Sequence, residues 1–204
     1  MQPDWDELYQ DGIKPWDKGT AAPPLLDWMN RNPQKLSGKI MVPGCGLGHD
    51  VRAIADVCPV AEVLGIDISG TALQEAAAFA KSGAERYEEL DLFDLPGVHH
   101  QSFDWIWEHT CFCAIDPERR DDYVEAVHRA LKPDGELLGI FYLDPYDEDH
   151  QPGGGPPHGT SVAELESRFV GSGRFEITEK YVPEVSYRGR AGLELMLRLK
   201  PSAL

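Results

Sequence analysis

Basic residues are scarce in this chain of 204 residues, in which 19 Lys and Arg stand against 35 Asp and Glu and give a formal net charge of −16. Proteins that bind nucleic acids draw most of their affinity from basic side chains that contact the phosphates. The charge balance therefore argues against DNA or RNA as a partner.

Long hydrophobic runs are also missing. No apolar stretch approaches the roughly 18–20 residues of a membrane-spanning helix, and residues 1–5 lack the basic and apolar regions of a signal peptide. The cysteines form no CxxC pair and show no zinc-like spacing to the histidines. We expect a cytoplasmic protein without a membrane anchor or a metal site, with reduced thiols at four positions: Cys45, Cys58, Cys111 and Cys113.

The composition is close to that of an average globular protein, with 42% hydrophobic and 26% charged residues. These values argue against disordered and fibrous architectures. A length of 204 residues fits one compact domain with a full hydrophobic core. We therefore predict a single domain over residues 1–204, as a monomer or a weak dimer.

Short apolar segments alternate with helical patterns from residue 37 onward, which is the order that predicts a parallel sheet covered by helices on both faces. A charged segment, 84–90, is expected at a sheet edge, where polar side chains prevent unwanted pairing. Strict alternation of leucines from Leu193 to Leu199 predicts an antiparallel pair that closes the sheet. The predicted strands are 39–42, 61–67, 84–90, 103–107, 136–142, 174–182 and 193–200.

The predicted helices have recognisable ends. Ser69 is placed to cap a helix that runs through Lys81, and Asp116 is placed to cap the next one. The sequence Lys-Pro-Asp-Gly at 132–135 is expected to break that second helix before the following strand. A capping-box pattern at 161–164 predicts a last helix that ends near Gly171.

A glycine-rich turn follows the first predicted strand and opens a helix. In Gly44-Cys45-Gly46-Leu47-Gly48 the missing side chains let a ligand approach the backbone, and the helix N-terminus offers free N–H groups to an anion. Asp67 lies 19 residues after Gly48, at the end of the next strand, where a carboxylate can bind both ribose hydroxyls. The structural alternative is that Gly48 only permits close helix packing and that Asp67 only caps the following helix.

The spacing of the glycines indicates which ribose-bearing ligand is bound. The dinucleotide fingerprint G-x-G-x-x-G needs a glycine at position 49, where this chain has His49. The pattern disfavours a dehydrogenase and favours a smaller adenosine ligand with a carboxylate end, which S-adenosylmethionine (SAM) fits. Asp91 is then placed to accept from the adenine amino group and Leu92 to pack on the ring, although Asp91 also fits an ordinary solvated loop.

Over nearly its whole length the chain resembles the thiopurine, thiol and halide methyltransferase family of class I SAM-dependent enzymes. The N-terminal Trp-Asp element and the Gly-Gly-Pro-Pro run are the narrower signals, since the glycine turn alone indicates only the superfamily. The resemblance rests on Trp5-x-x-x-Tyr9-x-x-Gly12-x-x-Pro15-Trp16-Asp17-x-Gly19, Val42-Pro43-Gly44-Cys45-Gly46-x-Gly48-His49-Asp50, Gly65-x-Asp67-x-Ser69, Asp91-Leu92-Phe93-Asp94-Leu95-Pro96, Phe112-Cys113-Ala114-Ile115-x-Pro117-x-x-Arg120, Leu131-Lys132-Pro133-Asp134-Gly135-Glu136 and Gly154-Gly155-Pro156-Pro157.

The resemblance implies a Rossmann-like class I methyltransferase fold, with a mostly parallel seven-stranded sheet and an antiparallel C-terminal strand. It also implies that aromatic residues cover the cofactor, that the glycines meet its amino-acid end and that Asp67 meets its ribose. A position that is arginine in the thiopurine branch is His109 here, which favours thiols or halides. The implied cofactor-binding residues are Trp5, Tyr9, Trp16, Gly44, Gly46, Asp67, Asp91, Leu92 and His109.

The aromatic residues also make physical sense, because a Trp or Tyr face attracts a positively charged sulfonium by a cation–π interaction worth about 2 kcal/mol when desolvated. The alternative is that Trp5, Tyr9 and Trp16 only form the apolar face of an N-terminal helix and turn. We expect Trp16, Phe112 and Tyr142 to line the acceptor pocket. The expected parts are an N-terminal lid with helices (1–36), a cofactor-binding core (37–142), a substrate loop (143–160) and a C-terminal helix with a strand pair (161–204).

The predicted activity is SAM-dependent methyl transfer to a small soft nucleophile: a thiol, bisulfide, a halide or a thiopurine. A thiol is already a few per cent thiolate at pH 7 and a halide carries no proton, so neither strictly requires a base. Two alternatives stay open: a methyltransferase acting on oxygen or nitrogen, which needs a base, and a non-catalytic SAM-binding protein. The candidate helpers for proton transfer are His109, His158, Asp17 and Glu108.

Overall fold

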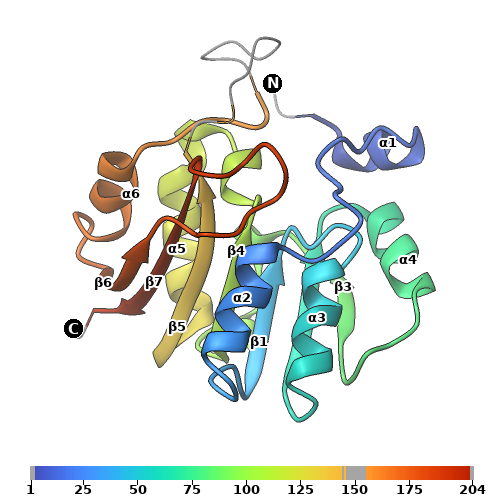
Figure 1. The fold of residues 1–204 in the computed structure, drawn as a ribbon, viewed down its shortest axis with the longest axis horizontal. Coiled ribbons are helices and arrows are strands. Elements are labelled where there is room, and N and C mark those ends of the chain that lie inside the picture. The colour runs from blue at the N-terminus through green and yellow to red at the C-terminus, as the bar shows by residue number, and fades with distance from the viewer. Residues whose placement is uncertain (1–2, 144, 146–154, 203–204) are drawn as a thin grey trace.

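The computed structural model describes residues 3–143, 145 and 155–202. One seven-stranded sheet runs through it in the order β3-β2-β1-β4-β5-β7-β6, with helices on either side (Figure 1). Within the described residues, the helices are all too short or too polar to cross a bilayer. The strands are β1 (Lys39–Pro43), β2 (Glu62–Asp67), β3 (Arg86–Glu89), β4 (Phe103–His109), β5 (Leu131–Tyr142), β6 (Phe175–Tyr181) and β7 (Glu194–Pro201).

Each face of the sheet carries its own hydrophobic core, because successive residues of a strand point to opposite faces. Ile40 and Val42 of β1 pack with α2 and α3, whereas Met41 packs with α5 and α6. The predicted parallel sheet with helices on both faces is therefore confirmed. The helices are α1 (Trp5–Gln10), α2 (Pro23–Arg31), α3 (His49–Val57), α4 (Gly70–Ala78), α5 (Arg120–Ala130) and α6 (Val162–Phe169).

The two edges of the sheet also agree with the sequence patterns. β3 is the outer strand on one side and pairs in parallel with β2. On the other side, β7 runs antiparallel to both β5 and β6. The sheet is therefore mostly parallel, with an antiparallel C-terminal strand, as predicted.

Several element boundaries differ from the prediction, and two of the differences are large. α4 ends at Ala78, before Lys81, and β5 begins at Leu131, directly after α5. The pairing with β4 jumps from Phe103 opposite Leu131 to Trp105 opposite Glu136, so the expected helix break at 132–135 is instead a bulge inside the strand.

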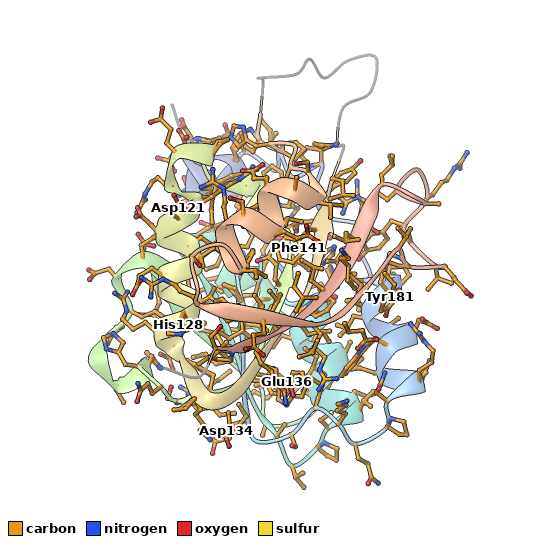
Figure 2. The ribbon with its side chains drawn as sticks, turned by 90° about the vertical axis from the view of Figure 1, so that its left-hand side faces the viewer. Asp121, His128, Asp134, Glu136, Phe141 and Tyr181 are labelled. Carbon is orange, nitrogen blue, oxygen red and sulfur yellow. The ribbon has the colours of Figure 1, made fainter. Side chains whose placement is uncertain are left out.

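The carboxyl ends of the parallel strands lie at the upper edge of the molecule in Figure 1, where α1 lies beside α4. Figure 2 shows the same polarity along β5, with Asp134 and Glu136 at the lower end and Phe141 higher. In a parallel sheet the loops at this edge are the usual place for a ligand site. All the predicted cofactor residues of the core lie at or just after such strand ends.

Candidate functional site

The glycine turn connects β1 to α3 in a left-handed backbone conformation. Gly44, Gly46 and Gly48 have φ angles of 57°, 50° and 69°, a region that side-chain-bearing residues rarely adopt. The N–H of Cys45 donates to the carbonyl of Ile66 at 3.0 Å, which ties the turn to the end of β2. The turn thus requires glycine for its own shape.

The space beside each of these glycines is occupied by a side chain from another part of the protein. A Cβ atom on Gly44 would lie 3.1 Å from Cys111 Sγ, one on Gly46 would lie 2.7 Å from Tyr9 Oη, and one on Gly48 would lie 2.5 Å from Tyr87 Oη. The lack of a side chain at Gly48 therefore permits close packing against Tyr87, as the structural alternative proposed. Gly44 faces Cys111, which packs against the core on the α5 side, and Gly46 faces Tyr9, which packs with Trp16.

Asp67 is fixed against the turn by backbone donors. Its Oδ2 accepts from the N–H of Gly46 at 2.8 Å, and its Oδ1 accepts from the N–H of Ser69 at 3.0 Å. Burial raises the pKa of Asp67, although these hydrogen bonds oppose the shift. The helix α4 is capped by Ser69, whose hydroxyl accepts from the N–H of Ala72. Asp67 is therefore not the cap of α4, and its carboxylate, which has about four acceptor positions, retains capacity for a further donor.

Three aromatic residues near the N-terminus form one cluster, which we call the aromatic roof: Trp5, Tyr9 and Trp16. The ring of Trp16 lies 5.1 Å from that of Trp5 and 5.6 Å from that of Tyr9, both edge to face. The indole N–H of Trp16 donates to Tyr9 Oη at 2.9 Å. Burial raises the pKa of Tyr9. The roof also packs on Leu47 of the glycine turn, so it closes directly over the turn.

The aromatic roof is anchored by Asp6, a residue that the sequence analysis missed. Its carboxylate accepts from the N–H of Thr71 at 2.9 Å and from the hydroxyl of Ser69 at 2.7 Å. The backbone donor at Thr71 and the Ser69 hydroxyl lower the pKa of Asp6 to about 2. Lys14 forms a further ion pair with Glu75. These contacts dock α1 on the start of α4, next to Asp67.

His109 ends β4 on the other side of the turn. Its Nδ1 lies 2.8 Å from Asp50 Oδ2, and the ring stacks on Tyr187 with centroids 5.9 Å apart. Asp50 also accepts from Trp107 Nε1 at 2.8 Å and from the N–H of Ala22 at 2.7 Å. The sequence analysis did not single out Asp50 or Tyr187. An acid in the first turn of a helix ordinarily only complements the helix dipole.

Asp91 and Leu92, the two residues expected to hold the adenine, lie in different environments. Asp91 is exposed, and its carboxylate accepts from the N–H of Phe93 at 2.9 Å. Leu92 is buried in the core on the α5 side. Their contact with a ligand stays a prediction.

The residues predicted to line the acceptor pocket also differ in their burial. Tyr142 is half-buried beneath the guanidinium of Arg190, at 4.6 Å. Phe112 is 1% exposed and packs against Tyr123, Phe141 and Phe169 in the core. This placement corrects the prediction for Phe112, because a ring enclosed by three others supports the site from behind and does not face an acceptor.

The substrate loop expected at 143–160 is partly outside the described residues, which omit 144 and 146–154, including Gly154 of the Gly-Gly-Pro-Pro run. Its described end is attached to the β4 side of the site. The N–H of His158 donates to the carbonyl of Cys113 at 2.7 Å, and that of Thr160 donates to the carbonyl of Leu143 at 3.0 Å.

Two of the candidate helpers for proton transfer are occupied by protein contacts. Asp17 lies 3.1 Å from the Nε2 of His49 and accepts from the N–H of Gly19. Glu108 is completely buried; it accepts from the N–H of Phe112 at 2.8 Å and from the hydroxyl of Tyr123. Since Tyr123 lies in the core, Glu108 is a structural acid here.

The pKa of Glu108 gives a testable pH dependence of stability. Burial raises this pKa from 4.5 to about 7, against the opposing hydrogen bonds from Tyr123 and Phe112. Between these values the folded protein retains a proton that the unfolded chain releases, so this stability is present at acid pH and is lost as pH rises through about 7. We expect urea unfolding from pH 5 to pH 8 to show a loss on the order of 2 kcal/mol in the wild type that Glu108→Gln lacks. Parallel profiles for the two proteins would contradict this assignment.

A cavity of about 210 Å³ lies elsewhere, against α3, the end of α4 and β3. Its eight lining residues include Arg52, Phe79 and Tyr87 but none of the predicted site residues. Arg52 is already bonded to the carbonyl of Leu47 and the hydroxyl of Tyr87. We therefore locate the candidate site at the glycine turn and not at this cavity.

The glycine turn, Asp67 and the aromatic roof provide the groups that an adenosyl sulfonium requires. Asp67 is a carboxylate at the end of β2 that can accept from ribose hydroxyls, and the aromatic faces suit a positive charge. The residues present thus fit SAM in their chemistry.

Solved structures share this fold. A SAM-dependent methyltransferase from Methanosarcina mazei matches with a TM-score of 0.69 and 20% sequence identity, covering 86% of this chain and 98% of that one. Together with the strand order and the antiparallel β7, this match defines a class I methyltransferase fold.

Sequence comparisons identify the family. The family model for thiopurine S-methyltransferase (TPMT) matches residues 1–194. Thiocyanate methyltransferase 1 from Brassica oleracea is 36% identical over 96% of this chain and 84% of its own length. The probable thiol methyltransferase 2 from Arabidopsis thaliana is 32% identical over 98% of this chain and 85% of its own length. The chain belongs to the TPMT family, and it is a SAM-dependent methyltransferase.

Proposed function

We propose that this enzyme transfers the methyl group of SAM to a small soft nucleophile, with thiols and thiocyanate-like or halide anions preferred over thiopurines. The observation that carries the proposal is the similarity over 96% of the chain to a thiocyanate methyltransferase, together with His109 at the site that resembles an arginine position of the thiopurine branch. SAM, when bound, supplies a methyl group on a positively charged sulfonium.

In this proposal the protein residues bind the cofactor and orient it for methyl transfer. Gly44 and Gly46 hold the amino-acid end of the cofactor, Asp67 binds the ribose hydroxyls, and Asp91 with Leu92 holds the adenine. The aromatic roof excludes water and presents its rings to the sulfonium. Alignment of this kind supplies a large share of the rate enhancement in displacement reactions. The assignment of residues 1–36 as a lid, 37–142 as the core, 143–160 as the substrate loop and 161–204 as the closing part belongs to the same proposal.

Arg190 lies next to Tyr142, a residue expected to line the acceptor pocket, in a chain whose net charge is −16. Arg190 lies 4.6 Å from the ring of Tyr142 and 5.6 Å from that of Tyr187, although Glu194 pairs with it at 3.3 Å. Burial, together with the nearby charge of Arg190, lowers the pKa of Lys18. Because Glu194 offsets the charge of Arg190 and the pKa of Lys18 is lowered, the positive charge that attracts an anionic acceptor is that of the bound sulfonium.

The test is an acceptor panel at one SAM concentration. Purified enzyme is given thiocyanate, iodide, bisulfide, an alkyl thiol, an acidic aryl thiol and a thiopurine, and methylated product is measured together with S-adenosylhomocysteine. We expect turnover of the thiols and of thiocyanate, with the thiopurine slower. Turnover confined to oxygen or nitrogen acceptors would favour the competing methyltransferase activity, and tight SAM binding without any turnover would favour a non-catalytic binding protein.

A further inference from the structure

The two ring nitrogens of His109 differ in their contacts. Its Nδ1 is bonded to Asp50, but its Nε2 is buried and has no hydrogen-bond partner among the residues that the structure describes. Leaving a buried polar atom unpaired costs about 1–3 kcal/mol. A histidine kept in this state at the carboxyl edge of the sheet calls for a functional explanation.

The contacts of Asp50 define the tautomer of His109. Burial raises the pKa of Asp50, but the neighbouring His109 and hydrogen bonds from His109, Trp107 and Ala22 outweigh it, so the pKa is lowered. A carboxylate can only accept hydrogen bonds, so the Nδ1 of His109 must donate. The neutral ring therefore has its lone pair on Nε2, which is the arrangement of a general base oriented by a carboxylate.

The ring of His109 is held firmly and lies beside the cofactor turn. It stacks on Tyr187, whose hydroxyl donates to the carbonyl of Thr20 at 2.6 Å, and it lies 6.3 Å from the ring of Trp107. Cys111, two residues after His109, touches the glycine turn at Gly44. The titratable and charged groups around the imidazole are Asp50 from α3, Glu108 on β4, and Tyr187 with Arg190 behind it.

We propose, resting on the proposed function, that His109 Nε2 is the base that deprotonates neutral thiol acceptors, with Asp50 as its positioning residue. The S–H proton passes to Nε2 and gives an imidazolium paired with Asp50. The electron pair left on the acceptor sulfur forms the bond to the methyl carbon, while the carbon–sulfonium bond breaks and its pair stays on the donor sulfur. The imidazolium afterwards returns its proton to water.

This assignment separates two classes of acceptor. A thiol with a pKa near 8.5 is about 3% thiolate at pH 7. A base that removes its proton can therefore raise the methylation rate about 30-fold at pH 7, and it has almost no effect above pH 9. Thiocyanate, iodide and an acidic aryl thiol that is already ionised carry no proton to remove. His109 therefore matters most for weakly acidic thiols near neutral pH.

The experiment compares acceptors in His109→Gln and in the wild type. We expect the ratio of kcat/KM for a cysteine-like alkyl thiol, with a pKa near 8.5, to kcat/KM for thiocyanate to fall about 30-fold at pH 7 in the variant, and the alkyl-thiol rate to recover as pH rises through 8.5. His99→Gln is the matched control. That histidine is also buried, has an unpartnered Nδ1 and a carboxylate 3.6 Å away, but packs on Phe103 at the opposite end of β4. Its variant should keep the wild-type ratio.

A second readout needs no turnover. In the ¹⁵N-labelled wild-type protein, imidazole nitrogen shifts should show the neutral ring of His109 with hydrogen on Nδ1 and none on Nε2. Hydrogen on Nε2, or equal losses for alkyl thiol and thiocyanate in His109→Gln, would overturn the base assignment while leaving soft-nucleophile methylation intact. Failure of the wild type to methylate either acceptor would instead overturn the proposed function, and this inference with it.

Discussion

Replacement of Asp67 by alanine should weaken the binding of SAM and of S-adenosylhomocysteine about 100-fold. A hydrogen bond to a charged group is worth about 1.5–3 kcal/mol, and in this account the Asp67 carboxylate accepts from the ribose hydroxyls. A loss of about 3 kcal/mol corresponds to slightly more than a hundredfold in affinity. The change is measured as a dissociation constant by titration calorimetry or equilibrium dialysis.

The control for this prediction is Asp56→Ala, which removes an exposed carboxylate from α3 and should leave the affinity unchanged. Thermal unfolding of Asp67→Ala is recorded in parallel, because the N–H groups of Gly46 and Ser69 lose their acceptor. A folded Asp67→Ala protein that binds within fivefold of the wild type would remove Asp67 from the cofactor site.

Replacement of Arg120 by alanine should lower the free energy of unfolding by about 3 kcal/mol. Arg120 is 1% exposed, and its guanidinium donates to the carbonyls of His158 and Gly159 at 2.9 and 3.1 Å and to Glu164 at 3.0 Å. It also lies 4.6 Å from the ring of Phe112. Breaking a buried ion pair costs about 3–5 kcal/mol, and the lower value applies because Glu164 keeps its bond to Arg168.

The adjacent Arg119 provides the matched control. It is partly exposed and pairs with Asp122 at the surface, and surface pairs of this kind contribute about 0–1 kcal/mol. Chemical denaturation of both variants tests the difference. Equal small losses in Arg119→Ala and Arg120→Ala would show that Arg120 does not anchor the end of the substrate loop.

Local patterns in the sequence were sufficient for much of the fold. The alternating leucines of β7, the charged edge strand β3 and the caps at Ser69 and Ser161 each depend on near neighbours in the chain. The glycine turn and Asp67 were predictable for the same reason, because a strand, a turn and a helix fix their relative places.

The contacts that complete the site were not predictable in this way. Asp50 and His109 are 59 residues apart, and Asp6 and Ser69 are 63 residues apart. Neither pair has a local signature, since an acid near a helix start also fits a solvated surface. The bulge at 132–135 was missed because Pro and Gly normally mark a break, whereas here β4 pairs on both sides of them. The burial of Phe112 likewise depends on α5 and α6, which come later in the chain.

The most direct test of the site is a crystal structure of the enzyme with S-adenosylhomocysteine. We predict that both ribose hydroxyls lie within about 3.2 Å of the Asp67 carboxylate, with the amino-acid end against the backbone of Gly44 and Gly46 under Trp16 and Tyr9. A ligand bound in the cavity lined by Arg52 and Phe79, or one whose ribose does not contact Asp67, would contradict the account.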